Sequence, residues 1–217
     1  MCMSVVKSRT ARFAPETYDV GTMEEAQAVI LHPHPGGTVD ERWTCETPYL
    51  GGLIEKHLGL TKDTLLLDFG CGVGRLSWET MRRTGCKAVG VDYSASMRAL
   101  AASYVDSPRF MACAVEMLDV LGPFQFDAAI TVWVLQHCLN PIIEIRQITR
   151  ALKPGGLLFV LNDKRCIPTN HGFVSDDADV KAMLFANLKL KEVIQLDPLM
   201  GERLLQTAYC AIYQKAY

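Results

Sequence analysis

Residues 65–75 constrain the fold of this chain more than any other segment. Their sequence is LLLDFGCGVGR, a short apolar run followed by an acid and three glycines at alternate positions. This order is typical of a buried strand that turns directly into a helix. Glycine has no Cβ and tolerates positive φ, so such a turn lets backbone N–H groups face a bound group. The segment therefore predicts a nucleotide-type cofactor site in an α/β sheet.

Two carboxylates flank this turn. Asp68 precedes it, and Asp92 follows 18 residues after Gly74, at the expected end of the next strand. A dinucleotide site has the spacing G-x-G-x-x-G and an open helix N-terminus for pyrophosphate, which the carboxylate of Asp68 would repel. An acid at Asp92 can accept both hydroxyls of a ribose. The pattern indicates a ligand with a ribose and a positive charge, and it disfavours nicotinamide-dependent redox chemistry.

These residues resemble the class I S-adenosylmethionine-dependent methyltransferases. The family's first motif is similar to residues 67–74, and its second ends in an acid like Asp92. Residues 126–137 (FDAAITVWVLQH) and 150–160 (RALKPGGLLFV) continue the similarity in the same order, so it covers roughly residues 64–162. The resemblance implies a Rossmann-like three-layer sandwich, an α/β fold with a seven-stranded, mostly parallel sheet and an antiparallel C-terminal strand.

The hydrophobic pattern alternates between the periods of strands and helices, which predicts a parallel sheet with helices on both faces. We expect residues 1–60 to form an N-terminal arm and helical lid, and residues 61–217 to form the methyltransferase domain. Over residues 41–57, Pro48 predicts two short helices joined at Thr47-Pro48. The other expected elements are strands at 65–69, 87–91, 109–113, 127–132 and 157–161, helices at 23–31, 75–84, 95–104 and from Pro141 with Asn140 as N-cap, and a late hairpin of strands 188–196 and 207–213 joined by residues 197–201.

The cofactor implied by the resemblance is S-adenosyl-L-methionine, with S-adenosyl-L-homocysteine as product. The chain departs from the family at Cys113, where an acid often bonds the adenine amino group. Adenine would then rely on backbone amides and apolar walls, while Glu116 is either a ligand or a helix cap. The expected cofactor-binding residues are Asp68, Gly70, Cys71, Gly72, Gly74, Asp92, Tyr93, Met97, Ala114, Val115 and Thr131.

Methyl transfer by direct in-line displacement needs an acceptor beside the cofactor. His137 follows the fourth expected strand and is a candidate general base and substrate contact, although a histidine in such a turn can also be non-catalytic. Trp43 and Tyr49 are candidate substrate contacts in the lid, with Trp43 as a core residue in the alternative interpretation. The arm and the segment 164–179 would form the acceptor's other walls. The acceptor atom is expected to be oxygen or nitrogen.

No metal is expected, because His32 and His34 lack a third ligand and Asn162-Asp163 has no matching acid after the fourth strand. The net charge of −2 disfavours a nucleic-acid partner and favours a small-molecule substrate. Eight scattered cysteines without a C-x-x-C pair indicate a reducing compartment, and no apolar stretch is long enough for a membrane, so we expect a cytoplasmic protein. The sequence does not predict an oligomeric state. The alternative function is an inactive cofactor-binding scaffold that regulates a partner.

Overall fold

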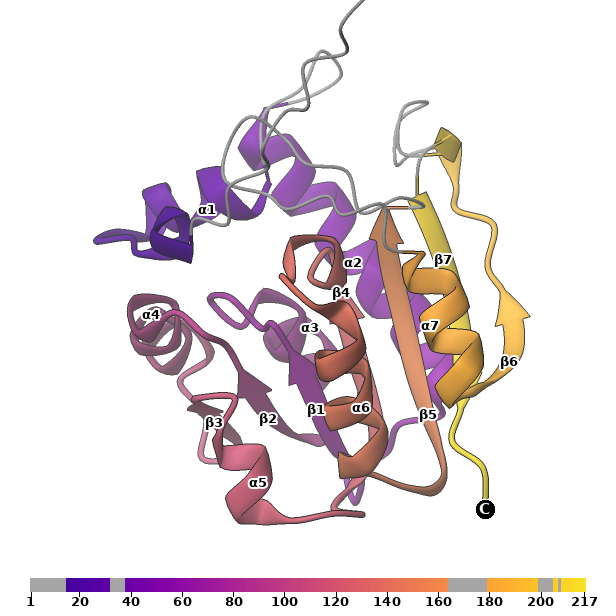
Figure 1. Ribbon diagram of the computed structural model, residues 1–217. Coiled ribbons are helices and arrows are strands. Elements are labelled where there is room, and N and C mark those ends of the chain that lie inside the picture. The colour runs from indigo at the N-terminus through magenta and orange to yellow at the C-terminus, as the bar shows by residue number, and fades with distance from the viewer. Residues whose placement is uncertain (1–14, 32–37, 164–178, 199–204, 207) are drawn as a thin grey trace, which may run out of the picture.

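The computed structural model describes residues 15–31, 38–163, 179–198, 205–206 and 208–217 (Figure 1). His32, His34, most of the segment 164–179 and part of the expected turn at 197–201 lie outside these residues. The described residues form a seven-stranded sheet with the order β3-β2-β1-β4-β5-β7-β6. The strands are β1 (Leu65–Phe69), β2 (Lys87–Val91), β3 (Phe110–Cys113), β4 (Phe126–Val132), β5 (Leu152–Asp163), β6 (Lys189–Val193) and β7 (Ala208–Gln214).

The first five strands pair in parallel, and β7 is antiparallel to both neighbours, β5 and β6. The predicted fold class is therefore confirmed, including the antiparallel last strand. The two late strands do pair with each other, but β7 is inserted between β5 and β6, and β6 is the edge strand on that side of the sheet. The carboxyl ends of the parallel strands meet at one border of the sheet, which we call the carboxyl edge.

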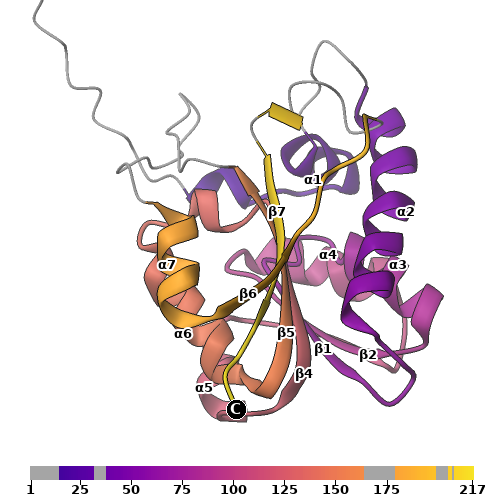
Figure 2. The ribbon, with the colours of Figure 1, turned by 90° about the vertical axis from the view of Figure 1, so that its right-hand side faces the viewer.

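Helices cover both faces of the sheet, as Figures 1 and 2 show from two sides. One face carries α2 (Val39–Leu58), α3 (Arg75–Thr84) and α4 (Ala95–Val105), and the other carries α5 (Met117–Leu121), α6 (Pro141–Ala151) and α7 (Val180–Asn187). The strands are apolar on both faces because both are covered. Leu66 packs in the cluster that contains Ile54 of α2, whereas its neighbour Leu67 packs in the cluster that contains Ile148 of α6.

The prediction of two helices joined at Pro48 is wrong, because α2 is one helix with this proline inside it. Two features outweigh the hydrogen bond that a proline removes. A capping box between Thr38 and Glu41 fixes the first turn. In the second half, Leu50 and Ile54 are fully buried against the sheet. Residues 41–57 thus belong to one helix of the sandwich's helical layer, and the arm and helical lid expected over residues 1–60 stay a prediction.

Residues 15–31 form a cover at the carboxyl edge. A 3-10 helix, η1 (Pro15–Tyr18), precedes α1 (Met23–Ile30), and α1 lies above α4 in Figure 1. A small cluster of Val20, Ala26, Val73 and Met97 holds this cover against the chain that follows β1 and β2. The expected helix at residues 23–31 is confirmed. Within the described residues, no helix combines the length and the apolar composition that crossing a membrane requires.

Helix α6 begins at Pro141, as predicted, but the side chain of Asn140 makes no capping hydrogen bond. Proline already fixes φ and removes one unpaired donor at this end, so the helix start does not depend on a side-chain cap. Its residues Ile145 and Ile148 are fully buried in the cluster that also contains Leu67 of β1.

Candidate functional site

The glycine turn, residues 70–74, joins β1 to α3 at the carboxyl edge. Gly70, Gly72 and Gly74 all have positive φ, at 78°, 53° and 76°. The N–H groups of Gly70 and Cys71 donate to the Val91 carbonyl at 2.8 and 3.0 Å. These two amides thus bond within the protein, and the cofactor-binding roles expected of Gly70 and Cys71 stay predictions.

Packing accounts for two of the three glycines. A Cβ on Gly70 would collide with the side chain of Val134, and one on Gly74 would lie 2.6 Å from Cγ2 of Val105. A Cβ on Gly72 would instead lie 3.0 Å from Cδ1 of Ile30 in the N-terminal cover. Gly72 therefore faces the cover, which also packs against Val73 of the same turn.

Asp92 lies directly beside Gly72. Its Oδ2 accepts the Gly72 N–H at 2.8 Å, and its Oδ1 accepts the Ser94 N–H at 2.9 Å. Burial raises the pKa of this carboxyl, and the backbone hydrogen bonds oppose that shift. A carboxylate has about four acceptor sites, so these two bonds leave Asp92 with further acceptor capacity. A fixed carboxylate with this capacity fits the two hydroxyls of a ribose.

Asp68 is only 3% exposed and points toward α3, where it accepts a hydrogen bond from the Ser77 hydroxyl at 2.6 Å. Burial raises its pKa to about 6, the Ser77 bond lowers it, and the charge of Asp92 raises it further. The buried guanidinium of Arg75 also favours the charged form of Asp68. The pair of acids predicted from the sequence is thus brought together, with Asp68 beneath and Asp92 nearer the surface.

The structure adds Tyr18, which the sequence interpretation did not single out. Its carbonyl accepts a hydrogen bond from the Ser94 hydroxyl at 2.7 Å, so the cover is joined to the chain two residues after Asp92. The Tyr18 hydroxyl is buried and has no hydrogen-bond partner in the described part of the chain, and the ring centroid of Tyr18 lies 6.1 Å from that of His137. Burial raises the pKa of Tyr18, and the charge of Asp92 adds to the shift. No local sequence signal marks this tyrosine.

His137 ends a short turn, η2 (Leu135–His137), that is held against β5. The Gln136 N–H donates to Asn162 Oδ1 at 3.0 Å, and the Asp163 N–H donates to Gln136 Oε1 at 2.7 Å. Gln136 Nε2 lies 3.2 Å from His137 Nε2. An amide nitrogen can only donate, so the imidazole nitrogen facing it is the acceptor. These bonds fix the position of His137 at the carboxyl edge.

The other predicted cofactor residues differ in accessibility. Met97 and Val115 are buried, and Thr131 is buried with an unpartnered hydroxyl. Ala114 has intermediate exposure, as does Cys113. Tyr93 is 58% exposed and donates its hydroxyl to Glu144 of α6 at 3.3 Å. Glu116 stands at the start of α5 but makes no side-chain cap.

Trp43 and Tyr49 lie on α2 and contact the scaffold. The guanidinium of Arg75 lies 5.4 Å from the Trp43 ring centroid, and the ring of Tyr104 packs edge-on at 6.0 Å. The Tyr49 hydroxyl accepts the Asp197 N–H at 2.8 Å. These contacts join α2 to α3, α4 and the chain after β6, and the substrate role of both residues stays a prediction.

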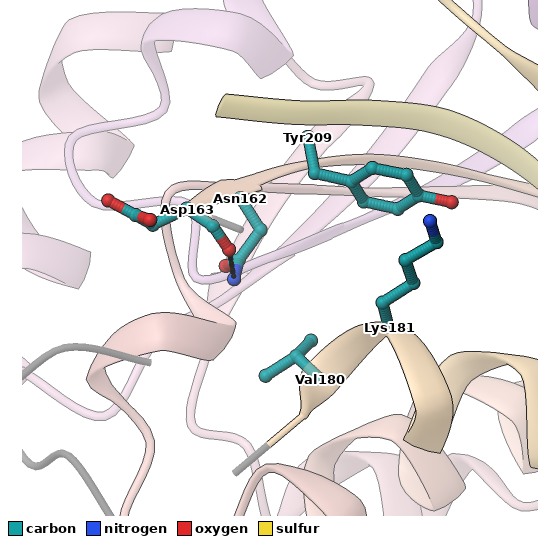
Figure 3. Close-up of a pocket in the computed structure, with 5 residues that line it drawn as sticks. All are labelled: Asn162, Asp163, Val180, Lys181 and Tyr209. Atoms are coloured by element: carbon teal, nitrogen blue, oxygen red, sulfur yellow. Dashed lines mark hydrogen bonds between the residues drawn. The ribbon is translucent and has the colours of Figure 1, made fainter. Parts of the chain in front are cut away.

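A pocket of about 210 Å³ opens at the carboxyl end of β5 (Figure 3). Its lining combines a carboxylate, an ammonium and an aromatic ring, and in Figure 3 the Lys181 side chain extends toward the Tyr209 ring. The ammonium lies 5.1 Å from that ring's centroid, which is a cation–π distance. The lining residues are Asn162, Asp163, Val180, Lys181 and Tyr209. In the described part of the chain, no group of three His, Cys, Asp or Glu side chains is arranged to hold a metal.

A family model described as a methyltransferase domain matches residues 67–160. The chain is 33% identical over 112 residues to the ubiquinone biosynthesis O-methyltransferase of Idiomarina loihiensis (strain ATCC BAA-735 / DSM 15497 / L2-TR), covering 50% of this chain and 46% of that protein. The chain spans about half the length of the curated relatives it matches.

Two solved structures share the fold. The N-methyltransferase NodS from Bradyrhizobium japonicum WM9, in complex with S-adenosyl-L-homocysteine, has a TM-score of 0.64 at 17% identity, over 81% of this chain and 88% of that chain. The [4+2]-cyclase SpnF has a TM-score of 0.64 at 22% identity, over 78% of this chain and 80% of that chain. At these identities the likeness concerns the fold alone.

Proposed function

We propose that this chain, which belongs to the class I S-adenosylmethionine-dependent methyltransferases, transfers a methyl group from S-adenosyl-L-methionine to an oxygen or nitrogen atom of a small molecule. The observation that carries the proposal is the carboxylate of Asp92. It is fixed by two backbone N–H groups beside Gly72, within the segment that matches the methyltransferase domain. Its remaining acceptor capacity suits a ribose.

The protein's task in this reaction is to bind and align. When bound, the cofactor supplies a methyl group that its sulfonium already makes electrophilic. Asp92 holds the ribose, the glycine turn passes under the methionine part, and Asp68 adds negative charge below the site. Met97, Val115 and the Tyr93 ring supply apolar walls. The cover formed by η1 and α1, within the lid of residues 1–60, excludes water from the reacting atoms.

The acceptor binds beside His137, between the end of β4 and the pocket at the end of β5. Gln136 first gives up its hydrogen bond to His137 Nε2, and this nitrogen then takes the proton of the acceptor. An acceptor with an oxygen atom should be tested first, because the relative with 33% identity is named an O-methyltransferase. The pocket volume of about 210 Å³ suits a small molecule or part of one.

The location we assign is the cytoplasm, since all six described cysteines are free thiols.

Calorimetric titration with S-adenosyl-L-homocysteine tests the cofactor site. We expect the wild-type chain to bind it and the Asp92→Ala variant to bind at least about tenfold more weakly, because charge-assisted hydrogen bonds are lost. The control is Asp63→Ala, an exposed acid in the turn before β1. Equal binding by the wild type and Asp92→Ala would refute the assignment. Isotope-labelled S-adenosyl-L-methionine with a panel of phenols, catechols and amines then tests methyl transfer.

A second function, a cofactor-binding scaffold without turnover, is favoured by one observation. The Tyr18 hydroxyl and ring occupy the space beside His137 in the described structure, where an acceptor would have to approach. The fold neighbour described as a [4+2]-cyclase also shows that this fold does not by itself dictate methyl transfer. Tight binding of S-adenosyl-L-homocysteine without methylation of any compound in the panel would support the scaffold.

A further inference from the structure

Glu144, in the first turn of α6, is a buried acid, and one of its two carboxylate oxygens is unpaired among the described residues. The residue is 7% exposed. Its Oε1 accepts the Tyr93 hydroxyl at 3.3 Å, whereas its Oε2 is buried and has no hydrogen-bond partner among the described residues. Burial raises the pKa of this carboxyl, whereas its interaction with the backbone N–H of Glu144 itself and the Tyr93 bond oppose the shift. Burying a carboxylate oxygen without a donor costs free energy, and buried polar atoms in native proteins are rarely left so.

The position of Glu144 relates this unused oxygen to the cofactor site. Tyr93 directly follows Asp92, the acid assigned to the ribose, and its side chain reaches from that point to α6. Tyr93 is 58% exposed, so the residue has accessible surface against which a purine can stack. A purine attached to a ribose at Asp92 and stacked along this ring would extend toward the hydroxyl end, where Glu144 lies.

The third strand offers no acid for the far edge of a purine. Cys113 ends β3, and burial raises the pKa of its thiol, so the group stays protonated and is only a weak acceptor. Glu116 is exposed and makes no side-chain cap on α5. Of these three side chains, Glu144 alone combines a carboxylate with a buried position and a contact to Tyr93.

We propose that Glu144 accepts a hydrogen bond from the exocyclic amino group of the cofactor's purine, which stacks on Tyr93; this assignment rests on the proposed function. A carboxylate has only acceptors, so it selects a 6-aminopurine. A 6-oxopurine would place its carbonyl oxygen against the carboxylate, and the two groups would repel each other. Purine specificity thus comes from the first turn of α6 in this chain.

The test measures affinities of the full chain for S-adenosyl-L-homocysteine and for its 6-oxo analogue, S-inosyl-L-homocysteine, by calorimetry. We expect the wild type to prefer the amino compound by at least about tenfold, the scale of one charge-assisted hydrogen bond. In Glu144→Gln that preference should collapse or reverse, because the new amide can donate to the 6-oxo group. The Tyr93 hydroxyl can still donate to the amide oxygen, so the variant retains the observed contact.

The matched control is Glu116→Gln, the exposed acid at the start of α5, which should keep the wild-type preference. Thermal unfolding of each variant establishes that it is folded. Should Glu144→Gln fail to fold, the wild-type comparison of the two compounds decides alone, since a wild type without preference overturns the proposal. An unchanged preference in folded Glu144→Gln also overturns it. A wild type that binds neither compound refutes the proposed function itself, which is a distinct result.

Discussion

Replacing Asp68 by asparagine should have a more favourable effect on the protein's stability at neutral pH than at pH 4. Burial raises the pKa of Asp68 to about 6 in the folded chain, whereas an unfolded aspartate titrates near 3.9. A difference of about two pKa units, at 1.36 kcal/mol each, corresponds to about 3 kcal/mol. Because the folded pKa is the higher one, this destabilisation is absent below pH 4, grows between pH 4 and 6, and is complete above pH 6.

The assay is thermal unfolding of the wild type and Asp68→Asn at several pH values from 4 to 8. The asparagine Oδ1 can still accept the Ser77 hydroxyl, but its NH2 group would be a new buried donor, which costs about 1–3 kcal/mol at every pH. The decisive quantity is therefore the change in the melting-temperature difference between pH 4 and pH 8. For a chain of this size, each kcal/mol that the buried charge of Asp68 costs should change this difference by about 2–4 °C in favour of the variant.

Asp63→Asn serves as the control, because this acid is exposed in the turn before β1 and should give the same small difference at every pH. A melting-temperature difference between wild type and Asp68→Asn that stays constant from pH 4 to 8 would refute the reasoning. It would mean that Arg75 and Ser77 keep Asp68 charged in the folded chain as easily as water does in the unfolded one.

Two further predictions concern packing and the turn that carries His137. Gly74→Ala should lower the free energy of unfolding in urea by about 1–3 kcal/mol, because φ is +76° and the new Cβ would lie 2.6 Å from Val105. In a Val105→Ala background the loss should be smaller, and additive losses would exclude this contact as the cause. Asn162→Ala removes the acceptor of the Gln136 N–H, so hydrogen exchange at residues 135–137 should quicken by the equivalent of about 1–3 kcal/mol. Unchanged exchange there would show that β5 does not hold the turn.

The strands and helices of the central sheet were predictable because their signals are local. The apolar run before Asp68 and the glycines after it specify a strand and a turn whatever surrounds them, and β1 and α3 have the predicted bounds. The error at Pro48 has the opposite cause. A proline is a local signal for a break, but the burial of Leu50 and Ile54 against the sheet is a tertiary contribution that no window of sequence contains.

The residues of the candidate site also divide into those that local sequence signals predict and those that depend on tertiary packing. Asp68 and Asp92 could be paired from the sequence, since the carboxyl ends of adjacent parallel strands must meet at one edge. Tyr18 and Glu144 could not, because each reaches that edge from an element whose position depends on packing. Tyr18 arrives with the N-terminal cover, and Glu144 lies on the buried side of an α6 face that a helical wheel would assign to core contacts.

A buried acid in a line of apolar positions is the one signal that sequence alone offers for Glu144. Ile145 and Ile148 place this side of α6 in the core, and an acid there is either paired or waiting for a donor. The structure supplies half of the pairing through Tyr93. The Oε2 atom either receives a donor at the cofactor site or stays unpaired and destabilises the fold. The two alternatives predict different effects of Glu144→Gln on cofactor binding and on stability. If a donor exists, Glu144→Gln weakens cofactor binding, and if none exists, the same change stabilises the protein and leaves binding intact.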